Sequence, residues 1–561
     1  MIGLVAATAN GNRNAAHLER AWPDARLYEG KPKEALRRAW EECDRIVLFL
    51  AAGAAVRLLA PLLKDKRHDP GVVCLDDAGR FAVALVGGHG GGANALAERA
   101  AAALGATPVV TTASDVANVP ALDLLGTELD FKIEDDSDLA GVGAALVSGE
   151  RVDLVSDARR PLGPLPQNVV RGEISGSPLI FISDRIMDLP RPSVVYRPPS
   201  LVAGVGCSRG ASAGEILALL DRSLEGAGLS KKSVAALASI EAKSDEAGLL
   251  EAAERLGVPL RFYAAGELSA MEVPNPSSVV EGAVGTPSVA EASVLAGGAD
   301  LVVEKKKSEN ATVAVGRLPV RGRLFLVSLG PGDDALIPPL AREALARSEL
   351  VVGLGQYVER VRHLLRPGTR VSTPPLGEEI GRAKQALDEA RAGGSVALVS
   401  GGDVGLYAMA SPALELAGED VDVTVVPGVT AAQAAASLLG SPLGHDHCSV
   451  SLSDLLTPWE VIEERVRAAA EGDFVISLYN PRSKGRDWQL GKVRKVLLVY
   501  RSPDTPVGIV KDAYREGQRV TLTDLGSLRL EDVDMLTTVI VGSSRTEIRA
   551  GRMVTPRGYE V

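Results

Sequence analysis

The stretch VSLGPGDDALIPPLAREAL, residues 327–345, decides the fold class. It starts in an apolar run, passes through a turn of Gly330, Pro331 and Gly332, and reaches Asp333 and Asp334 where a helix is expected to begin. A short apolar strand that leads through a glycine turn into a helix is typical of an α/β protein. Ligands of open α/β sheets bind at this edge, because strand ends and helix starts leave backbone groups free there.

Three similar junctions follow along the chain. They are LVSGGDVGLYAMASP (398–412), VVPGVTAAQAAASLLG (425–440) and VISLYNPRSKGR (475–486). A single glycine turn is more often only a tight reversal of the chain. Four such turns at successive strand ends favour a ligand site that neighbouring loops build together.

The residues in these turns restrict the class of ligand. Phosphate-binding loops spelled GxGxxG or GxxxxGK[ST] present consecutive backbone N–H groups, and neither spelling occurs here. Pro331 has no N–H to donate. Asp333, Asp334 and Asp403 would repel phosphate oxygens at short range. The site is therefore wrong for ATP or NAD and favours a phosphate-free, positively charged cofactor such as S-adenosylmethionine.

The motifs GPGD, SGGDVGLY, VVPGVTAA, LYNPRS and the later TTVIVG together resemble the tetrapyrrole methyltransferases. NPRSKGR is similar to the precorrin-3B C17-methyltransferases in particular, and the resemblance covers about 323–550. It implies two α/β subdomains with S-adenosylmethionine in the cleft between them, and a homodimer. Val404 stands where the family spelling GGDPG has proline. The resemblance implies cofactor contacts that are made mostly by main-chain atoms. Matched motif by motif, the contact residues are Pro331, Gly332, Gly401, Gly402, Asp403, Leu406, Thr430, Ala431, Leu478 and Ala513.

The chemistry implied by this resemblance is an in-line displacement at the cofactor's methyl carbon. An electron-rich tetrapyrrole carbon is itself the nucleophile, so alignment and exclusion of water matter more than a catalytic base. Arg482, Lys484 and Arg486 form a basic cluster that either binds substrate carboxylates or is a solvated loop, and the two interpretations weigh about equally. The resemblance also implies that methylation at carbon 17 accompanies ring contraction and formation of a lactone.

The composition of the chain limits its partners. The 561 residues are 46% hydrophobic and 24% charged, which predicts several globular domains. The net charge of −11 argues against nucleic acid and anionic membranes as partners, and no apolar run reaches the length of a membrane span. Cys43, Cys74, Cys207 and Cys448 show no CxxC spacing, so we expect no disulfide framework and no metal site. A cytoplasmic protein is the expectation.

The rest of the chain predicts further α/β domains. Apolar runs such as IGLVAATA and RIVLFLAA alternate with helical patterns, including one polar helix that extends to Trp40, and this rhythm predicts a parallel sheet. The spacing becomes irregular near Asp123, and the rhythm returns at Leu201 after a proline-rich linker. We predict domains at 1–122, 123–199 and 200–317, followed by the methyltransferase domain at 322–561.

Three stretches of this amino-terminal part carry candidate functional residues. GGHGGGAN (87–94) places His89 in a glycine turn, where it is either structural or an acid or base. GVGCSRG (204–210) contains Arg209, IEAKSDEAGL (240–249) contains Lys243, and Lys305 begins a lysine triplet. With PVVTTASD and GTPSVAEASVL, these motifs resemble the cobalt-precorrin-5A hydrolases over 1–316.

That family opens a δ-lactone and expels acetaldehyde. The chemistry needs an activated water, a donor for the developing oxyanion, and cations that hold the carboxylates of the substrate. The resemblance and the residue types suggest His89 as the base, backbone N–H groups of Gly88–Gly92 for the oxyanion, and Arg209, Lys243 and Lys305 for the carboxylates.

The sequence thus predicts a multidomain α/β chain in which a tetrapyrrole methylase fold is fused to a lactone hydrolase of corrin-ring biosynthesis. Its cofactor would be S-adenosylmethionine and its substrate a cobalt-bound or metal-free precorrin. Two alternatives remain open at this point. The amino-terminal half is a noncatalytic tetrapyrrole-binding module, or the methyl group goes to another precorrin carbon or a protein side chain.

Overall fold

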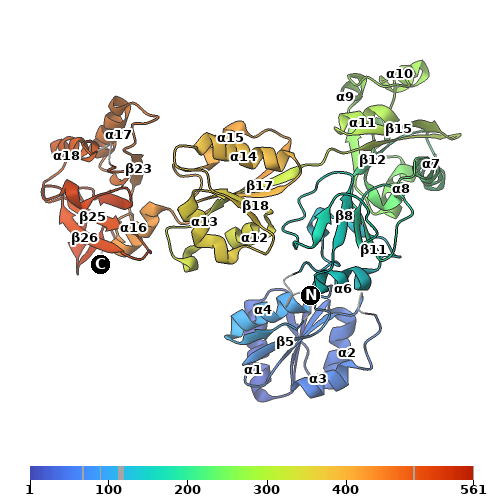
Figure 1. Ribbon diagram of the computed structural model, residues 1–561, viewed down its shortest axis with the longest axis horizontal. Coiled ribbons are helices and arrows are strands. Elements are labelled where there is room, and N and C mark those ends of the chain that lie inside the picture. The colour runs from blue at the N-terminus through green and yellow to red at the C-terminus, as the bar shows by residue number, and fades with distance from the viewer. Residues whose placement is uncertain (66–67, 89, 112–118, 484–486, 560–561) are drawn as a thin grey trace. The chain divides into compact units, whose positions relative to one another are not determined.

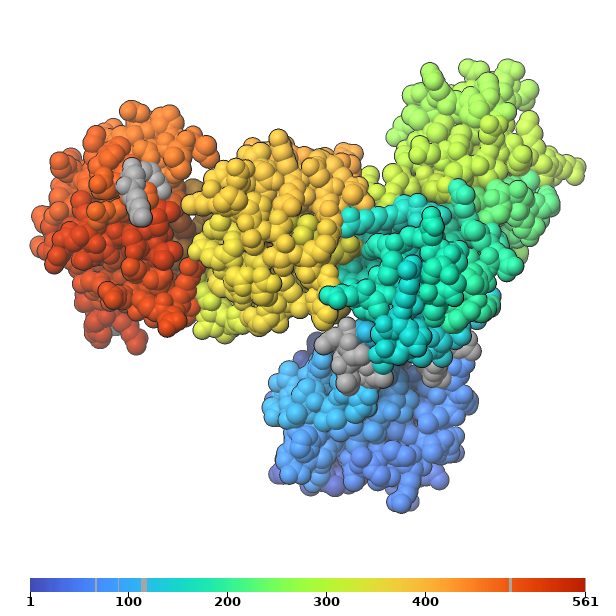
Figure 2. Space-filling view, in the orientation of Figure 1, coloured from blue at the N-terminus to red at the C-terminus, as the bar shows by residue number. Residues whose placement is uncertain are grey.

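The structure is a computed structural model that describes residues 1–65, 68–88, 90–111, 119–483 and 487–559 (Figure 1). The chain divides into two compact units. The first unit contains Met1–Ala158 and Leu165–Val320, and the second contains Arg159–Pro164 and Arg321–Val561. In the space-filling view, side chains close over the strands (Figure 2). Among the described residues, no helix combines the length and the apolar character needed to cross a membrane.

The first sheet of unit 1 has the strand order β2-β1-β3-β4-β5-β6. Its strands are β1 (Ile2–Ala6), β2 (Ala25–Leu27), β3 (Arg45–Phe49), β4 (Gly71–Leu75), β5 (Phe81–Val86) and β6 (Thr107–Val109). Its helices are α1 (Ala9–Ala21), α2 (Pro32–Glu42), α3 (Ala52–Leu59) and α4 (Ala93–Leu104).

Two expectations for this sheet were wrong. The single helix to Trp40 is two helices separated by β2, because Trp22 precedes Pro23 and is extended, and Gly30 has φ +117°. The sheet is also not wholly parallel, because β5 runs antiparallel to β4. A turn at Asp76–Gly79 connects these two strands directly, without a crossover helix.

The second sheet of unit 1 has the order β7-β11-β10-β8-β9. Its strands are β7 (Lys132–Ile133), β8 (Val152–Ser156), β9 (Val169–Arg171), β10 (Leu179–Ile182) and β11 (Ser193–Arg197), accompanied by η1 (Thr127–Leu129) and α6 (Leu139–Ser148). Tyr196 is fully buried and donates its hydroxyl to Leu122 O at 2.6 Å. This bond joins the sheet to the segment that precedes it.

The third sheet has the order β14-β13-β12-β16-β15. Its strands are β12 (Leu201–Cys207), β13 (Val234–Ile240), β14 (Leu260–Tyr263), β15 (Asp300–Lys307) and β16 (Ala311–Arg317). Its helices are α7 (Ala213–Gly226), η2 (Lys231–Ser233), η3 (Glu241–Lys243), α8 (Ala247–Leu256), α9 (Ala265–Ser269), α10 (Ser278–Val284) and α11 (Ala290–Ala296).

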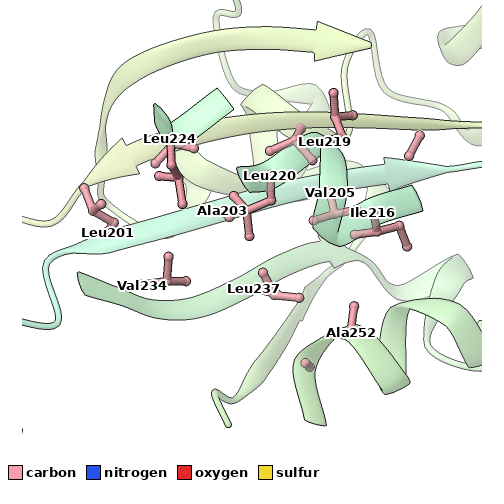
Figure 3. Packing of buried hydrophobic residues seen from close by; sticks show 14 of the residues in the cluster. Leu201, Ala203, Val205, Ile216, Leu219, Leu220, Leu224, Val234, Leu237 and Ala252 are labelled. Atoms are coloured by element: carbon pink, nitrogen blue, oxygen red, sulfur yellow. The ribbon is translucent and has the colours of Figure 1, made fainter. Parts of the chain in front are cut away.

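The core of this third sheet combines alternate residues of β12 with one face of α7 (Figure 3). Leu220 of α7 is fully buried in this cluster. On the opposite side, a Cβ at Gly204 would lie 1.9 Å from Ala290 O, so glycine is required for α11 to pack closely against β12. Burial of both faces explains why β12 reads as a continuous apolar run.

The first sheet of unit 2 is parallel, with the order β19-β18-β20-β17-β21. Its strands are β17 (Gly322–Ser328), β18 (Leu350–Gly353), β19 (Arg370–Ser372), β20 (Ser395–Ser400) and β21 (Val421–Val426). Its helices are η4 (Asp334–Leu336), α12 (Pro339–Arg347), α13 (Gly355–Val361), η5 (Arg362–Leu364), α14 (Glu379–Arg391) and α15 (Ala410–Leu416).

The remaining strands of unit 2 form a mixed sheet, β23-β24-β27-β25-β26, and a small sheet, β22-β29-β28. The strands are β22 (Gly440–Ser441), β23 (His447–Ser451), β24 (Val475–Tyr479), β25 (Pro506–Lys511), β26 (Arg519–Asp524), β27 (Thr537–Val541), β28 (Glu547–Arg549) and β29 (Arg552–Val554). The helices are α16 (Ala431–Leu439), α17 (Trp459–Glu471), α18 (Gln489–Tyr500) and η6 (Leu530–Asp532). The α/β multidomain class predicted from the sequence is confirmed.

Candidate functional site

Loops at the carboxyl ends of three adjacent strands form one wall of the candidate site in unit 2. Because β17 lies between β20 and β21, the loops at 329–333, 401–405 and 427–430 are neighbours. Gly330 and Gly402 exchange two backbone hydrogen bonds, of 3.0 and 2.8 Å. Two of the glycine turns that the sequence singled out are therefore in direct contact.

Asp403 holds these loops together. Its Oδ1 accepts from Gly405 N at 2.8 Å and its Oδ2 accepts from Gly428 N, also at 2.8 Å. The buried Ser328 accepts from Val404 N at 2.8 Å. These bonds fix the turn although valine replaces the family's proline, and they leave the Asp403 carboxylate committed to backbone groups.

Glycine is required where the two subdomains of unit 2 meet. A Cβ at Gly332 would lie 2.6 Å from Tyr514 O and 2.3 Å from Arg515 Cγ. Arg515 also donates its Nε to Pro331 O at 2.6 Å. At the neighbouring turn, a Cβ at Gly401 would lie 2.6 Å from the Tyr357 ring. The Pro331–Gly332 turn is thus packed against the loop that contains Ala513.

The start of α16 forms a second part of the wall. Thr430 caps this helix by accepting from Gln433 N at 3.1 Å. The hydroxyl of Tyr479, at the end of β24, accepts from Ala432 N at 2.9 Å. The rings of Tyr407 and Tyr479 pack with centroids 5.3 Å apart, and burial raises the pKa of both phenols. The second and third junctions therefore meet the fourth.

The other predicted cofactor residues have different exposures. Leu478 is fully buried in the core of the mixed sheet, and Leu406 is partly exposed. Ala431 lies beside Gly402, since a Cβ on that glycine would be 3.9 Å from Ala431 N. Ala513 packs against the cluster that contains Leu439. Apart from Leu478, the predicted residues lie in loops or at a helix start around the same wall.

Four residues with left-handed backbone lie in these loops, and none of them was predicted from the sequence. Tyr407, Asn480, Asp512 and Tyr514 have φ values of +54°, +49°, +47° and +56°. Side chains rarely adopt this region, and such strain often occurs at functional sites. Asn480 in LYNP was the visible signal, because asparagine tolerates this conformation better than most residues.

An open cavity of about 660 Å³ lies beside the Pro331–Gly332 turn. It is lined by Gly332, Asp333, Arg360, Asp512, Tyr514, Arg515, Glu516 and Gln518. Asp333 caps η4 by accepting from Ala335 N at 2.8 Å, and Asp334 Oδ2 lies 2.6 Å from His363 Nε2. The two aspartates of the opening motif thus serve local structure, and the cavity also contains arginines that the sequence did not single out.

The predicted substrate-binding cluster is only partly described. Arg482 donates its Nη1 to Leu530 O at 2.7 Å, which anchors the side chain to η6. Lys484 and Arg486 lie outside the described residues.

In unit 1, the predicted base His89 also lies outside the described residues. The turn around it is compact, because Ala93 N donates to Gly87 O at 3.0 Å and Asn94 N donates to Gly88 O at 2.9 Å. A Cβ at Gly91 would lie 2.8 Å from Gly71 N. Close approach to β4 therefore accounts for at least one glycine of this run.

The predicted carboxylate-binding cations of unit 1 have partners within the protein. Arg209 Nη1 lies 2.9 Å from both oxygens of Asp245, and this hydrogen bonding raises the pKa of Arg209. Lys243 Nζ lies 3.4 Å from Glu246 Oε2. Arg209 and Lys243 therefore lie together at the carboxyl ends of β12 and β13. Lys305 is on β15 and donates to the carbonyl of Asn275.

The fold and the loops of unit 2 define an α/β protein with a candidate ligand site at the carboxyl ends of its parallel strands. Residues 323–529 match the family of Tetrapyrrole (Corrin/Porphyrin) Methylases. In unit 1, residues 34–115 match Cobalamin synthesis G N-terminal, 120–198 match Cobalamin biosynthesis central region, and 201–316 match Cobalamin synthesis G C-terminus.

Curated relatives agree with these matches. The chain is 47% identical over 239 residues to a probable cobalt-factor III C(17)-methyltransferase of Salmonella typhimurium, covering 42% of this chain and 99% of that one. It is 36% identical over 312 residues to the cobalt-precorrin-5A hydrolase of Priestia megaterium, covering 52% and 83%. A cobalt-factor III methyltransferase of Priestia megaterium is 44% identical over 248 residues, covering 43% of this chain and 46% of that protein, about half its length.

The chain therefore belongs to the tetrapyrrole methylases through unit 2 and to the cobalamin synthesis G family through unit 1. Both resemblances stated from the sequence are confirmed, as is the assignment to cobalamin biosynthesis with a methyltransferase part and a hydrolase part.

Proposed function

We propose that residues 322–561 methylate cobalt-factor III at carbon 17 with ring contraction, and that residues 1–317 open the lactone of cobalt-precorrin-5A and release acetaldehyde. The observation that carries this proposal is the coverage of two relatives. The chain covers 99% of the probable cobalt-factor III C(17)-methyltransferase and 83% of the cobalt-precorrin-5A hydrolase. The cobalt-containing substrate is favoured over the metal-free one because both relatives are named for cobalt compounds.

The residues of the unit 2 cleft fit S-adenosylmethionine. The loops contain Pro331, which cannot donate, and acidic side chains beside the cavity, both of which disfavour a polyphosphate. The Asp403 carboxylate already accepts two backbone N–H groups, so its contact with a cofactor would be through the main chain. The cofactor contacts proposed are Pro331, Gly332, Gly401, Gly402, Asp403, Leu406, Thr430, Ala431, Leu478 and Ala513.

When bound, S-adenosylmethionine supplies an electrophilic methyl carbon. The chain's own contribution is to hold the tetrapyrrole carbon in line with it and to exclude water. The hydrogen-bonded loops around Gly330, Gly402 and Asp403 are preorganised for this task. Arg482, Lys484 and Arg486 are proposed to bind substrate carboxylates, and the active form is proposed to be a homodimer.

In the hydrolase part, His89 is the proposed base that activates water. Arg209, Lys243 and Lys305 are the proposed ligands of the substrate's carboxylates. Since Arg209 and Lys243 are ion-paired with Asp245 and Glu246, a substrate carboxylate would have to exchange with these pairs. This cost favours a substrate that carries several carboxylates over one that carries a single charge.

The experiment that tests the methyltransferase is incubation of the full chain with methyl-labelled S-adenosylmethionine and cobalt-factor III, followed by NMR of the product. Label at carbon 17 is expected. Label at another carbon would support the alternative methyltransferase, and absence of transfer to cobalt-containing and metal-free substrates would exclude the proposal.

The hydrolase is tested separately, by measuring acetaldehyde released from cobalt-precorrin-5A. Release that is lost in His89→Ala is expected. A wild-type chain that binds this substrate without releasing acetaldehyde would instead be the noncatalytic module.

A further inference from the structure

Arg360 is the feature of unit 2 that the proposed contacts leave unexplained. It lies on α13, three residues after Tyr357, so that both side chains reach the loops on one side of the helix. Its Nη2 donates to Leu329 O at 3.2 Å. Its Nε and Nη1 are buried without any hydrogen-bond partner among the described residues. A buried guanidinium with two unused donors is costly, and native proteins seldom retain one without a reason.

A second arginine lines the same cavity. Arg515 is held at the Pro331 carbonyl by its Nε, and among the described residues no carboxylate forms a salt bridge with either arginine. Burial lowers the pKa of Arg360, and the charge of Arg515 lowers it further, so the two cations act on each other. Arg360 nevertheless stays protonated at neutral pH. An anion between them would relieve the repulsion and satisfy the unused donors.

We propose that Arg360 and Arg515 form a carboxylate-binding subsite in the cavity beside the Pro331–Gly332 turn. Asp333, Asp512 and Glu516 line the same cavity, which disfavours a multiply charged phosphate and suits a singly charged carboxylate. A rotation of the Arg360 side chain away from Leu329 O presents its fork to the ligand, and this geometry favours two parallel bonds.

This subsite rests on the proposed function, which offers two carboxylates: an acetate or propionate group of the tetrapyrrole, and the methionine carboxylate of the cofactor. The test replaces Arg360 by methionine in the full chain, which keeps an unbranched side chain and removes the charge. Arg362→Met is the matched control, because Arg362 lies two residues away, is 58% exposed and pairs with Glu359. Binding of cobalt-factor III is followed by absorbance, and binding of S-adenosylhomocysteine by calorimetry.

For Arg360→Met we expect the Kd of one of these two ligands to rise about 10- to 100-fold, the loss of one or two charge-assisted hydrogen bonds. The weakened ligand identifies the source of the carboxylate. The thermal transition should not fall, because Arg360 forms only one long hydrogen bond, to Leu329 O, and its removal also removes the cost of a buried cation that has no ion-pair partner among the described residues. Arg362→Met should leave both affinities unchanged.

Unchanged affinity for both ligands in Arg360→Met would overturn the subsite, as would a lowered thermal transition with unchanged binding, which would make Arg360 structural. These results are distinct from failure of the proposed function. In that case the wild-type chain itself would not bind or methylate cobalt-factor III, and the calorimetric measurement alone would decide the inference.

Discussion

Replacement of Asp403 by asparagine tests the idea that this residue holds the loops at 401–405 and 427–430 together. The two carboxylate oxygens each accept a backbone N–H at 2.8 Å, from Gly405 and from Gly428. Asparagine offers only one oxygen, so at least one bond is lost and an NH₂ group faces a backbone N–H. A hydrogen bond to a charged group contributes about 1.5–3 kcal/mol. We expect the free energy of unfolding of unit 2 to fall by about that amount.

The assay is calorimetric unfolding of the full chain with and without S-adenosylhomocysteine. The transition that moves upward with this ligand identifies unit 2, because a ligand that binds the folded state stabilises it. For a unit of this size, the expected loss lowers that transition by roughly 3 to 12 °C. Ligand affinity should fall at the same time, since the loop at 427–430 is no longer held against the turn at 401–405.

Asp422→Asn is the matched control. Asp422 is exposed on β21, so this change removes the same charge close by without removing a backbone contact. It should leave the transition and the ligand affinity unchanged. Equal effects of the two variants would refute the reasoning, because the result would then depend on the net charge and not on the two hydrogen bonds.

Three further predictions concern other parts of the chain. Gly332→Ala should weaken S-adenosylhomocysteine binding about tenfold, because the new Cβ overpacks the turn. Gly355→Ala should not, because no other part of the described chain comes within 4 Å of its new Cβ; equal binding by the two variants would contradict this. Burial opposes ionisation of Asp153, but hydrogen bonds to its carboxylate outweigh this effect and lower its pKa. Asp153→Asn should therefore lower the unfolding temperature at neutral pH, and lower it progressively less below about pH 4, where the wild type loses this contribution; unfolding temperatures between pH 7 and pH 3 test this. Leu220→Ala should lower the free energy of unfolding, measured by chemical denaturation, by about 2–5 kcal/mol. Leu250 is 46% exposed, so Leu250→Ala should lower it by less than about 1 kcal/mol; similar losses would argue against the core in Figure 3.

The sequence predicted the α/β class because buried parallel strands read as uninterrupted apolar runs. β17 and β20 are clear cases, since each lies between two other strands and is buried on both faces. The short strand β2 was missed because it has only three residues, of which two are partly buried and Arg26 is exposed, too few to show a periodicity. The antiparallel pairing of β5 was missed because strand direction depends on the connection and not on the composition of the strand.

The glycine turns were visible in the sequence, but several of their partners were not. Arg515 contacts Pro331 across 184 residues, and Tyr479 contacts Ala432 across 47. Such pairs join segments that are far apart in the sequence, so they are known only once the chain has folded. Arg360 gave no signal either, because its unused donors become apparent only once its burial is known.

The aspartates of the glycine loops show that a charge read from the sequence does not give the contacts of a side chain. Their charges were expected to repel phosphate, and this stays a prediction. In the structure, however, Asp333 caps η4, Asp334 lies against His363, and Asp403 accepts from two backbone N–H groups. Each is placed primarily by a local or tertiary bond, which a list of charges does not reveal.

Two strained residues of unit 2 show how contacts within the protein fix the backbone of these loops. Tyr407 and Tyr514 adopt left-handed backbone, which costs a residue with a side chain about 1–2 kcal/mol. Each is held by its hydroxyl, which binds Ser449 O at 2.8 Å for Tyr407 and Ser437 Oγ at 2.9 Å for Tyr514. Glycine would relieve the strain but remove the ring and its bond. The chain therefore accepts lower stability in these loops to fix their backbone, which is the arrangement that the proposed methyl transfer would need if it depends on alignment.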